Sequence, residues 1–201
     1  MVDFPLAAHE LVALVHRVPR ERLDGPGLGE WSLRELIAHA SRAVTVVPGY
    51  IVGDDRPITA PTAEAYFRVM LDTVGDDAAV AERGRQESRL LGDDVATAVE
   101  RRATDALARV PASGRVAVGD VVMDLGEYLR TRVLELTVHG IDIADAAGLA
   151  WEPPAAHVAD ALRIAAANAA ERDGVEALRL LTGRRPSAGL AGIFRSRPAQ
   201  R

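Results

Sequence analysis

The fold is decided by the stretch YLRTRVLELTVHGIDIADAAG, residues 128–148. Its apolar side chains return every three or four positions, which is the period of an α-helix with one buried face. Asp124 and Glu127 form a capping signal ahead of it, and Gly148 is suited to end a helix. The pattern therefore predicts one long helix from about Asp124 to Ala147.

A row of polar side chains lies in the middle of the face that this helix would bury. At about 100° per residue they share one narrow sector, with apolar side chains on both flanks. The row consists of Tyr128, Arg132, Glu135, His139 and Asp142. Buried polar groups are costly unless they bond to one another or to something bound. Glu135 and His139 are four residues apart and can reach one metal ion, and Asp142 can orient His139 as a hydrogen-bond acceptor.

A second helix supplies a third candidate ligand. In WSLRELIAHASRAVTVV, residues 31–47, Ser32 and Glu35 have the spacing of a capping box, so we expect a helix from about Ser32 to Val47. His39 lies among the apolar residues of this helix and is expected to point into the interior. Two helices that direct polar ligands toward a common core make a three-ligand metal site plausible.

The spacing alone leaves other interpretations open. His39 can be a core histidine that bonds to a backbone carbonyl, and Glu135 can pair with Arg132 or Arg34. Tyr128, by itself, is more typical of a core than of a site. On spacing alone, these alternatives are as well supported as a metal site.

Three other histidines are weaker candidates for metal ligands. His9 and His16 lie on the predicted first helix, where a mixed helix face explains them. His157 follows two prolines in the first turn of a helix, and we expect it to be exposed. We expect Trp31 to pack at the start of the second helix.

The remaining elements follow from periodicity and from turn residues. Helices are expected over residues 4–18, residues 62–74, a stretch that is broken near Gly92 and reaches Val110, Pro153 to about Arg172, and residues 175–183. A β-hairpin with a Gly119-Asp120 turn is expected over residues 115–123. We expect a loop over residues 48–61 and a frayed tail over residues 195–201.

Composition excludes several classes of protein. With 48% apolar and 26% charged residues, the chain can bury a core. The net charge of −5 and the absence of lysine argue against a general nucleic-acid binder. No apolar run is long enough to cross a membrane and no leader pattern is present, so we expect a cytoplasmic protein. Because there is no cysteine, any thiol chemistry must use a thiol from outside the chain.

Two stretches carry a resemblance to a known family: EWSLRELIAHASR, residues 30–42, and residues 128–148. Together they resemble the mycothiol-dependent maleylpyruvate isomerase family, which belongs to the DinB-like metal-binding helical bundles. The resemblance implies an all-α fold, a DinB-like up-down four-helix bundle with a small β-hairpin and a short C-terminal helical appendage. Residues 1–148 would form the bundle, and residues 149–201 a helical extension that packs on it.

The resemblance also implies what the site holds. It places metal ligands at His39, Glu135 and His139, and it implies a low-molecular-weight thiol, mycothiol or a similar molecule, as cosubstrate. Zinc is the expected ion, since two imidazoles and a carboxylate suit it. Asp142 would support His139, and Arg132 would contact an anionic group.

The lead functional hypothesis is a thiol-dependent metalloenzyme. Three protein ligands leave open positions on a zinc-like ion, where an external thiol can bind and become the nucleophile. It would isomerise a small electrophilic substrate or transfer sulfur to it. The alternatives are a metal-dependent hydrolase of a small molecule and a non-catalytic helical metal- or ligand-binding protein. The expected partners are a small-molecule substrate and a thiol, without nucleic acid or membrane, in a monomer or homodimer.

Overall fold

The computed structural model describes residues 3–53, 55–73 and 77–185, and for residues 71–73 and 77–81 it describes the backbone alone. The elements in this part are α1 (Phe4–Arg17), the 3₁₀ turn η1 (Arg20–Arg22), α2 (Leu33–Thr45), α3 (Val47–Tyr50), β1 (Ile51–Val52), α4 (Ala63–Thr73), α5 (Asp77–Arg89), α6 (Val95–Leu107), β2 (Arg115–Val118), β3 (Val121–Asp124), α7 (Leu125–Ala147) and α8 (Ala155–Leu181). None of the described helices is both long and apolar enough to pass through a bilayer.

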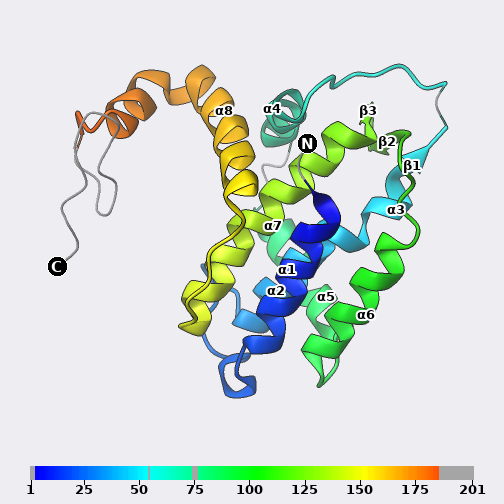
Figure 1. Cartoon of the computed structure of the whole chain (residues 1–201), viewed down its shortest axis with the longest axis vertical. Helices are drawn as coiled ribbons and strands as arrows, with labels where there is room; N and C mark the ends of the chain where they lie inside the picture. Colours follow the sequence, from blue (N-terminus) through cyan, green and yellow to red (C-terminus); the bar gives the residue numbers. More distant parts are fainter. Residues whose placement is uncertain (1–2, 54, 74–76, 186–201) are drawn as a thin grey trace. The chain divides into compact units, whose positions relative to one another are not determined.

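The chain divides into two compact units, Met1–Ala161 and Leu162–Arg201. In the first unit, α1 packs against α6 and α7, and α2 packs against α5, α6 and α7 (Figure 1). Helix α4 lies against α7. The interior is filled mainly by aliphatic side chains, of which Leu11, Leu14, Leu36, Leu136 and Ile143 are at most 2% exposed. The prediction of an all-α helical bundle with a small β-hairpin is confirmed.

Helix α2 begins at the predicted capping box. The Ser32 hydroxyl accepts a hydrogen bond from the Glu35 backbone N–H at 3.3 Å, and the Glu35 carboxylate accepts one from the Ser32 N–H at 2.8 Å. These bonds satisfy two N–H groups that an α-helix leaves free at its start. The capping box therefore fixes the start of the helix, and His39 follows six residues after the first helical residue, Leu33.

Helix α7 begins and ends where the sequence predicts, although one expected capping bond is missing. Gly148 follows it in the left-handed conformation, with φ at 71°. At the other end, Asp124 occupies the predicted N-cap position, but its side chain makes no capping hydrogen bond. Asp124 is also the last residue of strand β3, and the Leu125 N–H donates to the Gly114 carbonyl at 2.8 Å. The Glu127 carboxylate is used by α4, where it accepts from the Ala63 N–H at 2.9 Å.

The predicted β-hairpin is present and is part of a larger sheet. Strands β2 and β3 pair antiparallel around Gly119, whose φ of 59° is a conformation that glycine adopts readily in two-residue hairpin turns. Strand β1 pairs with β2 and makes the sheet three-stranded. The expected loop over residues 48–61 thus contains the end of α3 and all of β1, because two residues are enough to pair with an existing hairpin edge but too few to form a sequence pattern.

The C-terminal elements also differ in part from expectation. Helix α8 joins the two helices predicted there, with a non-helical residue at Asp173 between them. His157 is only 2% exposed, so its predicted exposure is wrong. The reason lies three residues further on: Arg130 of α7 holds the buried Asp160, which turns the side of the helix that carries His157 inward. The predicted frayed tail, residues 195–201, lies outside the described residues.

Candidate metal centre

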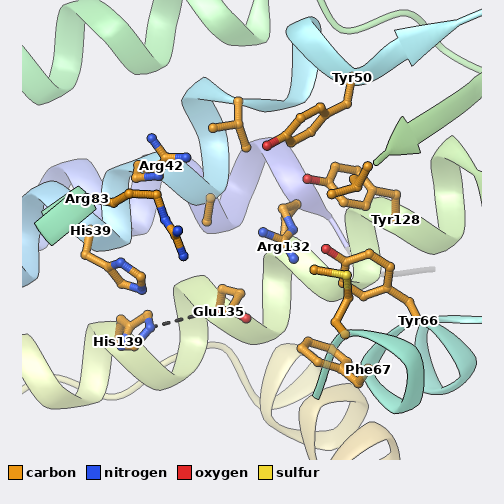
Figure 2. A pocket seen from close by; sticks show the side chains of 14 residues that line it. His39, Arg42, Tyr50, Tyr66, Phe67, Arg83, Tyr128, Arg132, Glu135 and His139 are labelled. Carbon is orange, nitrogen blue, oxygen red and sulfur yellow. Dashed lines mark ion pairs between the residues drawn. The ribbon is translucent and has the colours of Figure 1, made fainter. Parts of the chain in front are cut away.

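Three predicted ligands come together between α2 and α7, the two helices in which the sequence motifs lie. His39 of α2 faces Glu135 and His139 of α7, and one ligand atom from each lies within 4.8 Å of the others (Figure 2). Among the residues that the structure describes, these three side chains form a group whose geometry is suited to a metal ion.

His139 is held between two carboxylates. Its Nε2 lies 3.3 Å from Glu135 Oε2, and its Nδ1 lies 3.1 Å from Asp142 Oδ2. Burial lowers the pKa of His139, but the hydrogen bonds and charges of the two carboxylates outweigh it, so the pKa is raised. A carboxylate at Nδ1 favours the tautomer that donates there, so Nε2 is the nitrogen that an ion would bind in place of the proton shared with Glu135.

Glu135 is ionised in this setting. Burial raises the pKa of Glu135, but the hydrogen bond from His139 and the charge of Arg132 more than compensate, and the pKa lies below its usual value. The carboxylate is therefore available as a ligand at neutral pH. Its 3.3 Å separation from His139 Nε2 is close to the roughly 3.4 Å expected between two atoms that bind one tetrahedral zinc ion at about 2.0–2.1 Å.

His39 has an unusual environment for a core histidine. Burial, and after it the neighbouring His139, lowers the pKa of His39 to about 4, so the ring is neutral at pH 7. Its Nδ1 is buried without a hydrogen-bond partner among the residues that the structure describes. The alternative of a carbonyl-bonded core histidine therefore does not match the geometry. A neutral imidazole, an ionised carboxylate and a second imidazole are a donor set that a divalent ion such as zinc accepts.

The other interpretation of Glu135 also disagrees with the geometry. Arg34 pairs with Asp24 at 3.4 Å and donates to the Gly92 carbonyl at 2.7 Å, so it is occupied elsewhere. Arg132 and Glu135 form no ion pair within 4.0 Å in the described structure, although the charge of each shifts the pKa of the other. The Glu135 carboxylate is instead paired with His139, at 3.3 Å.

A cavity of about 490 Å³ opens beside the three ligands. It is large enough for a small molecule. Besides the ligands, its walls consist of Arg42, Ala43, Val46, Tyr50, Tyr66, Phe67, Met70, Arg83, Val118, Tyr128 and Arg132 (Figure 2). Three guanidinium groups face one carboxylate across this lining, so the cavity favours an anionic guest.

Arg132 lies among aromatic rings at the end of the cavity away from His39 and His139 (Figure 2). Its guanidinium carbon is 4.7 Å from the ring centroid of Tyr128 and 5.8 Å from that of Tyr66, and its Nε donates to the Thr131 hydroxyl at 3.0 Å. Burial lowers the pKa of Arg132, but Tyr128 and Glu135 outweigh it and the net shift is upward. Arg132 is thus a charged group without a carboxylate partner within 4.0 Å in the described residues.

Sequence reasoning missed several residues of the cavity wall. Tyr50, Tyr66 and Arg83 come from α3, α4 and α5, outside the two motifs. No spacing rule links them to α7, since they reach the cavity through helix packing. Conversely, His9 and His16 are exposed and remain outside the site, and His16 lies 2.9 Å from Glu100.

Arg42 is held at the cavity wall by a partly buried carboxylate. Glu87 of α5 bonds to Arg42 at 2.7 Å and to Arg102 of α6 at 2.8 Å, with its side chain 18% exposed. Burial raises the pKa of Glu87, but Arg102 and Arg42 lower it further, so the carboxyl stays ionised below its usual pKa. The bridge therefore ties three helices together near the site.

Glu87→Gln is expected to lower the free energy of unfolding at pH 7 by about 1–3 kcal/mol, because two charge-assisted bonds are weakened. The folded-state pKa of Glu87 is lowered, so this stabilisation is present above the unfolded pKa and is lost as the pH falls through the folded one. Urea unfolding at pH 7 and near pH 3 should show the difference shrinking at the acidic end. Glu100→Gln, which removes an exposed partner of His16, is the control and should change stability by less than about 1 kcal/mol.

The fold and the site define a class: helical bundles with a candidate histidine–glutamate–histidine metal centre facing a cavity. The family model of the mycothiol maleylpyruvate isomerase N-terminal domain matches residues 4–144, and the chain belongs to this family. All three candidate ligands lie within the matched residues. No curated protein and no solved structure matches the chain significantly.

Proposed function

We propose that this protein is a metalloenzyme that uses a low-molecular-weight thiol, mycothiol or a close relative, on a small electrophilic substrate. One observation carries the proposal: a His–Glu–His donor set lies on the wall of a cavity rather than in a closed core. A structural metal site is normally enclosed by four protein ligands, whereas a catalytic one has three and an open side. Membership of the mycothiol-related family supports the same conclusion.

The chain's composition explains why the thiol must be external. It has no cysteine, so the nucleophilic sulfur has to enter the cavity with a cosubstrate. A divalent ion held by His39, Glu135 and His139, most simply zinc, supplies positive charge that lowers the pKa of a thiol bound to it. Addition of the sulfur to a carbon–carbon double bond, with the thiol proton passing to the neighbouring carbon, gives an S-conjugate. Reversal of the addition after rotation about the new single bond gives an isomer.

The remaining side chains have separate tasks in this proposal. Asp142 accepts from His139 Nδ1 and fixes the orientation of the ring. Arg132 binds an anionic group of the substrate at the tyrosine end of the cavity. The phenyl rings of Tyr66 and Tyr128 restrict access of water to that end. We propose a cytoplasmic location, where low-molecular-weight thiols are abundant in reduced form.

The direct test is turnover by the zinc-loaded protein. A panel of small α,β-unsaturated acids would be incubated with mycothiol, and products would be separated by chromatography and mass spectrometry. The proposal expects S-conjugates or isomers that require both the thiol and the three ligands. Turnover that proceeds equally well without thiol would contradict the thiol-dependent mechanism and favour water as the nucleophile. Absence of both activities, with metal bound, would contradict an enzymatic role on this substrate class.

Asp142→Ala is expected to lower zinc affinity about 10–100-fold, because His139 loses the acceptor that fixes its tautomer and orientation. Competition with a zinc-binding dye measures the effect. Asp145→Ala is the matched control, since Asp145 lies one turn away on the same helix and is exposed. Equal affinities of the two variants would show that Asp142 does not support a ligand.

A further inference from the structure

The two histidines of the centre are held in different ways. His139 has a hydrogen-bond acceptor at Nδ1, the Asp142 carboxylate at 3.1 Å. His39 has none there: its Nδ1 is buried and has no hydrogen-bond partner among the described residues. Histidines that bind metals almost always donate their second ring nitrogen to an acceptor, which fixes the ring. Something else must fix the orientation of the His39 ring.

The contact that fits this role is aromatic. The indole of Trp31 lies against the His39 ring, with centroids 4.5 Å apart and an interplanar angle of 38°. The His139 ring meets His39 edge-on, with centroids 4.9 Å apart and an angle of 84°. Trp31 does not line the cavity, so it contacts His39 on the side away from the cavity and leaves the side that faces the cavity free. Among the described residues, the His39 imidazole is therefore held by packing against the rings of Trp31 and His139.

The position of Trp31 depends in turn on a glycine. Gly84 of α5 is buried, and a Cβ atom at this position would lie 3.1 Å from Cε2, 3.2 Å from Nε1 and 3.3 Å from Cζ2 of Trp31. These distances are shorter than ordinary van der Waals contacts. Glycine in the middle of a helix is unfavourable compared with alanine, so its presence here is explained by the room that it leaves for the indole.

We propose that Trp31, seated against Gly84, is a positioning residue that orients His39 toward the metal ion and replaces the missing hydrogen bond. The inference rests on the proposed metal-binding role of His39, Glu135 and His139. It assigns Trp31 and Gly84 a part in the centre, although neither residue can bind the ion and Gly84 lies on a third helix. The helices α2, α5 and α7 then all determine the ligand geometry.

The test compares metal binding in Trp31→Leu, Trp31→Phe and Gly84→Ala with the wild type. Trp31→Leu removes the ring and is expected to weaken zinc binding about 3–10-fold, the range that a lost aromatic pair explains. Trp31→Phe keeps a ring against His39 and should restore most of the affinity. Gly84→Ala pushes the indole and is expected to weaken zinc binding at least 2-fold. Thermal stability is measured alongside, because the better helix propensity of alanine and the tight contact with the indole act in opposite directions.

A spectroscopic readout separates positioning from general packing. Cobalt(II) replaces zinc in such sites, and its visible absorption depends on ligand geometry. We expect an altered spectrum for Trp31→Leu and Gly84→Ala and a spectrum close to the wild type for Trp31→Phe. Phe4→Leu is the control, because Phe4 is buried in α1 and does not line the cavity, so the change should lower stability without altering the cobalt spectrum.

The outcomes distinguish this inference from the proposed function. If wild type binds neither zinc nor cobalt, or if His39→Ala binds them normally, the proposed function fails. If wild type binds, His39→Ala does not, and both Trp31→Leu and Gly84→Ala bind with unchanged affinity and spectrum, only the positioning role is overturned. If Trp31→Leu does not fold, Gly84→Ala decides the result alone, because its extra methyl group perturbs the indole without removing it.

Discussion

Glu135→Ala is expected to lower the zinc affinity of this protein by more than about 100-fold. Loss of a residue that merely supports a ligand costs about 10–100-fold, so loss of one of three ligands must cost more. Among the described residues that line the cavity, Glu135 is also the one carboxylate, and without it the ion would face three guanidinium groups and two imidazoles. Electrostatics and coordination therefore act in the same direction.

Elemental analysis and dye competition on purified protein measure this effect. His39→Ala and His139→Ala should behave like Glu135→Ala. His9→Ala is the matched control, because this histidine is exposed on α1 and takes no part in the centre. Circular dichroism must show that all four variants are folded. Full metal content in Glu135→Ala and His39→Ala would mean that the ligand assignment is wrong.

The sequence predicted the two helices that matter because their signals are local. Helix α2 is specified by Ser32 and Glu35 within four residues, and the end of α7 by Gly148. Side-chain direction along a helix follows from its period, so His39, Glu135 and His139 could each be assigned to an inward face. That these faces meet required only that α2 and α7 be neighbours in a bundle.

The rest of the site depends on contacts between distant segments. Tyr66 reaches the cavity because α4 packs on α7, where Glu64 and Glu127 share Arg130. At the start of α7 a distant segment also contributes, since the Leu125 N–H donates to the Gly114 carbonyl. His157 is buried because Asp160 is held by the same arginine, Arg130. In each case the structure depends on a contact between distant segments that no local sequence pattern encodes.

Arg130 and Arg132 of α7 have contrasting surroundings. Arg130 bonds to three carboxylates, those of Glu64, Glu127 and Asp160. Arg132, two residues further on, faces the cavity and has tyrosine rings and a threonine hydroxyl as neighbours, with no carboxylate within 4.0 Å among the described residues. A guanidinium is not deprotonated in proteins, so this charge persists at every relevant pH. A bound anion would supply the counter-charge that the protein itself does not.

Arg132→Met is therefore expected to lower kcat/KM for a carboxylate-bearing electrophile about 10–100-fold, the effect of losing one charge-assisted hydrogen bond. Methionine keeps an unbranched apolar side chain between the tyrosines, and zinc content should not change. For the methyl ester of the same electrophile, which lacks the charge, the loss should be less than about 3-fold. Steady-state kinetics with the acid and the ester measure the difference directly.

The comparison has an internal pH check. The pKa of Arg132 is raised, so the guanidinium remains charged, and the advantage of the acid over the ester should persist at every pH above the pKa of the substrate carboxyl. Arg101→Met, an exposed arginine of α6, is the control and should leave both substrates unaffected. If Arg132→Met reduced turnover of acid and ester equally, Arg132 would support the cavity wall rather than bind the substrate, and the preference for anions would have to come from Arg42 or Arg83.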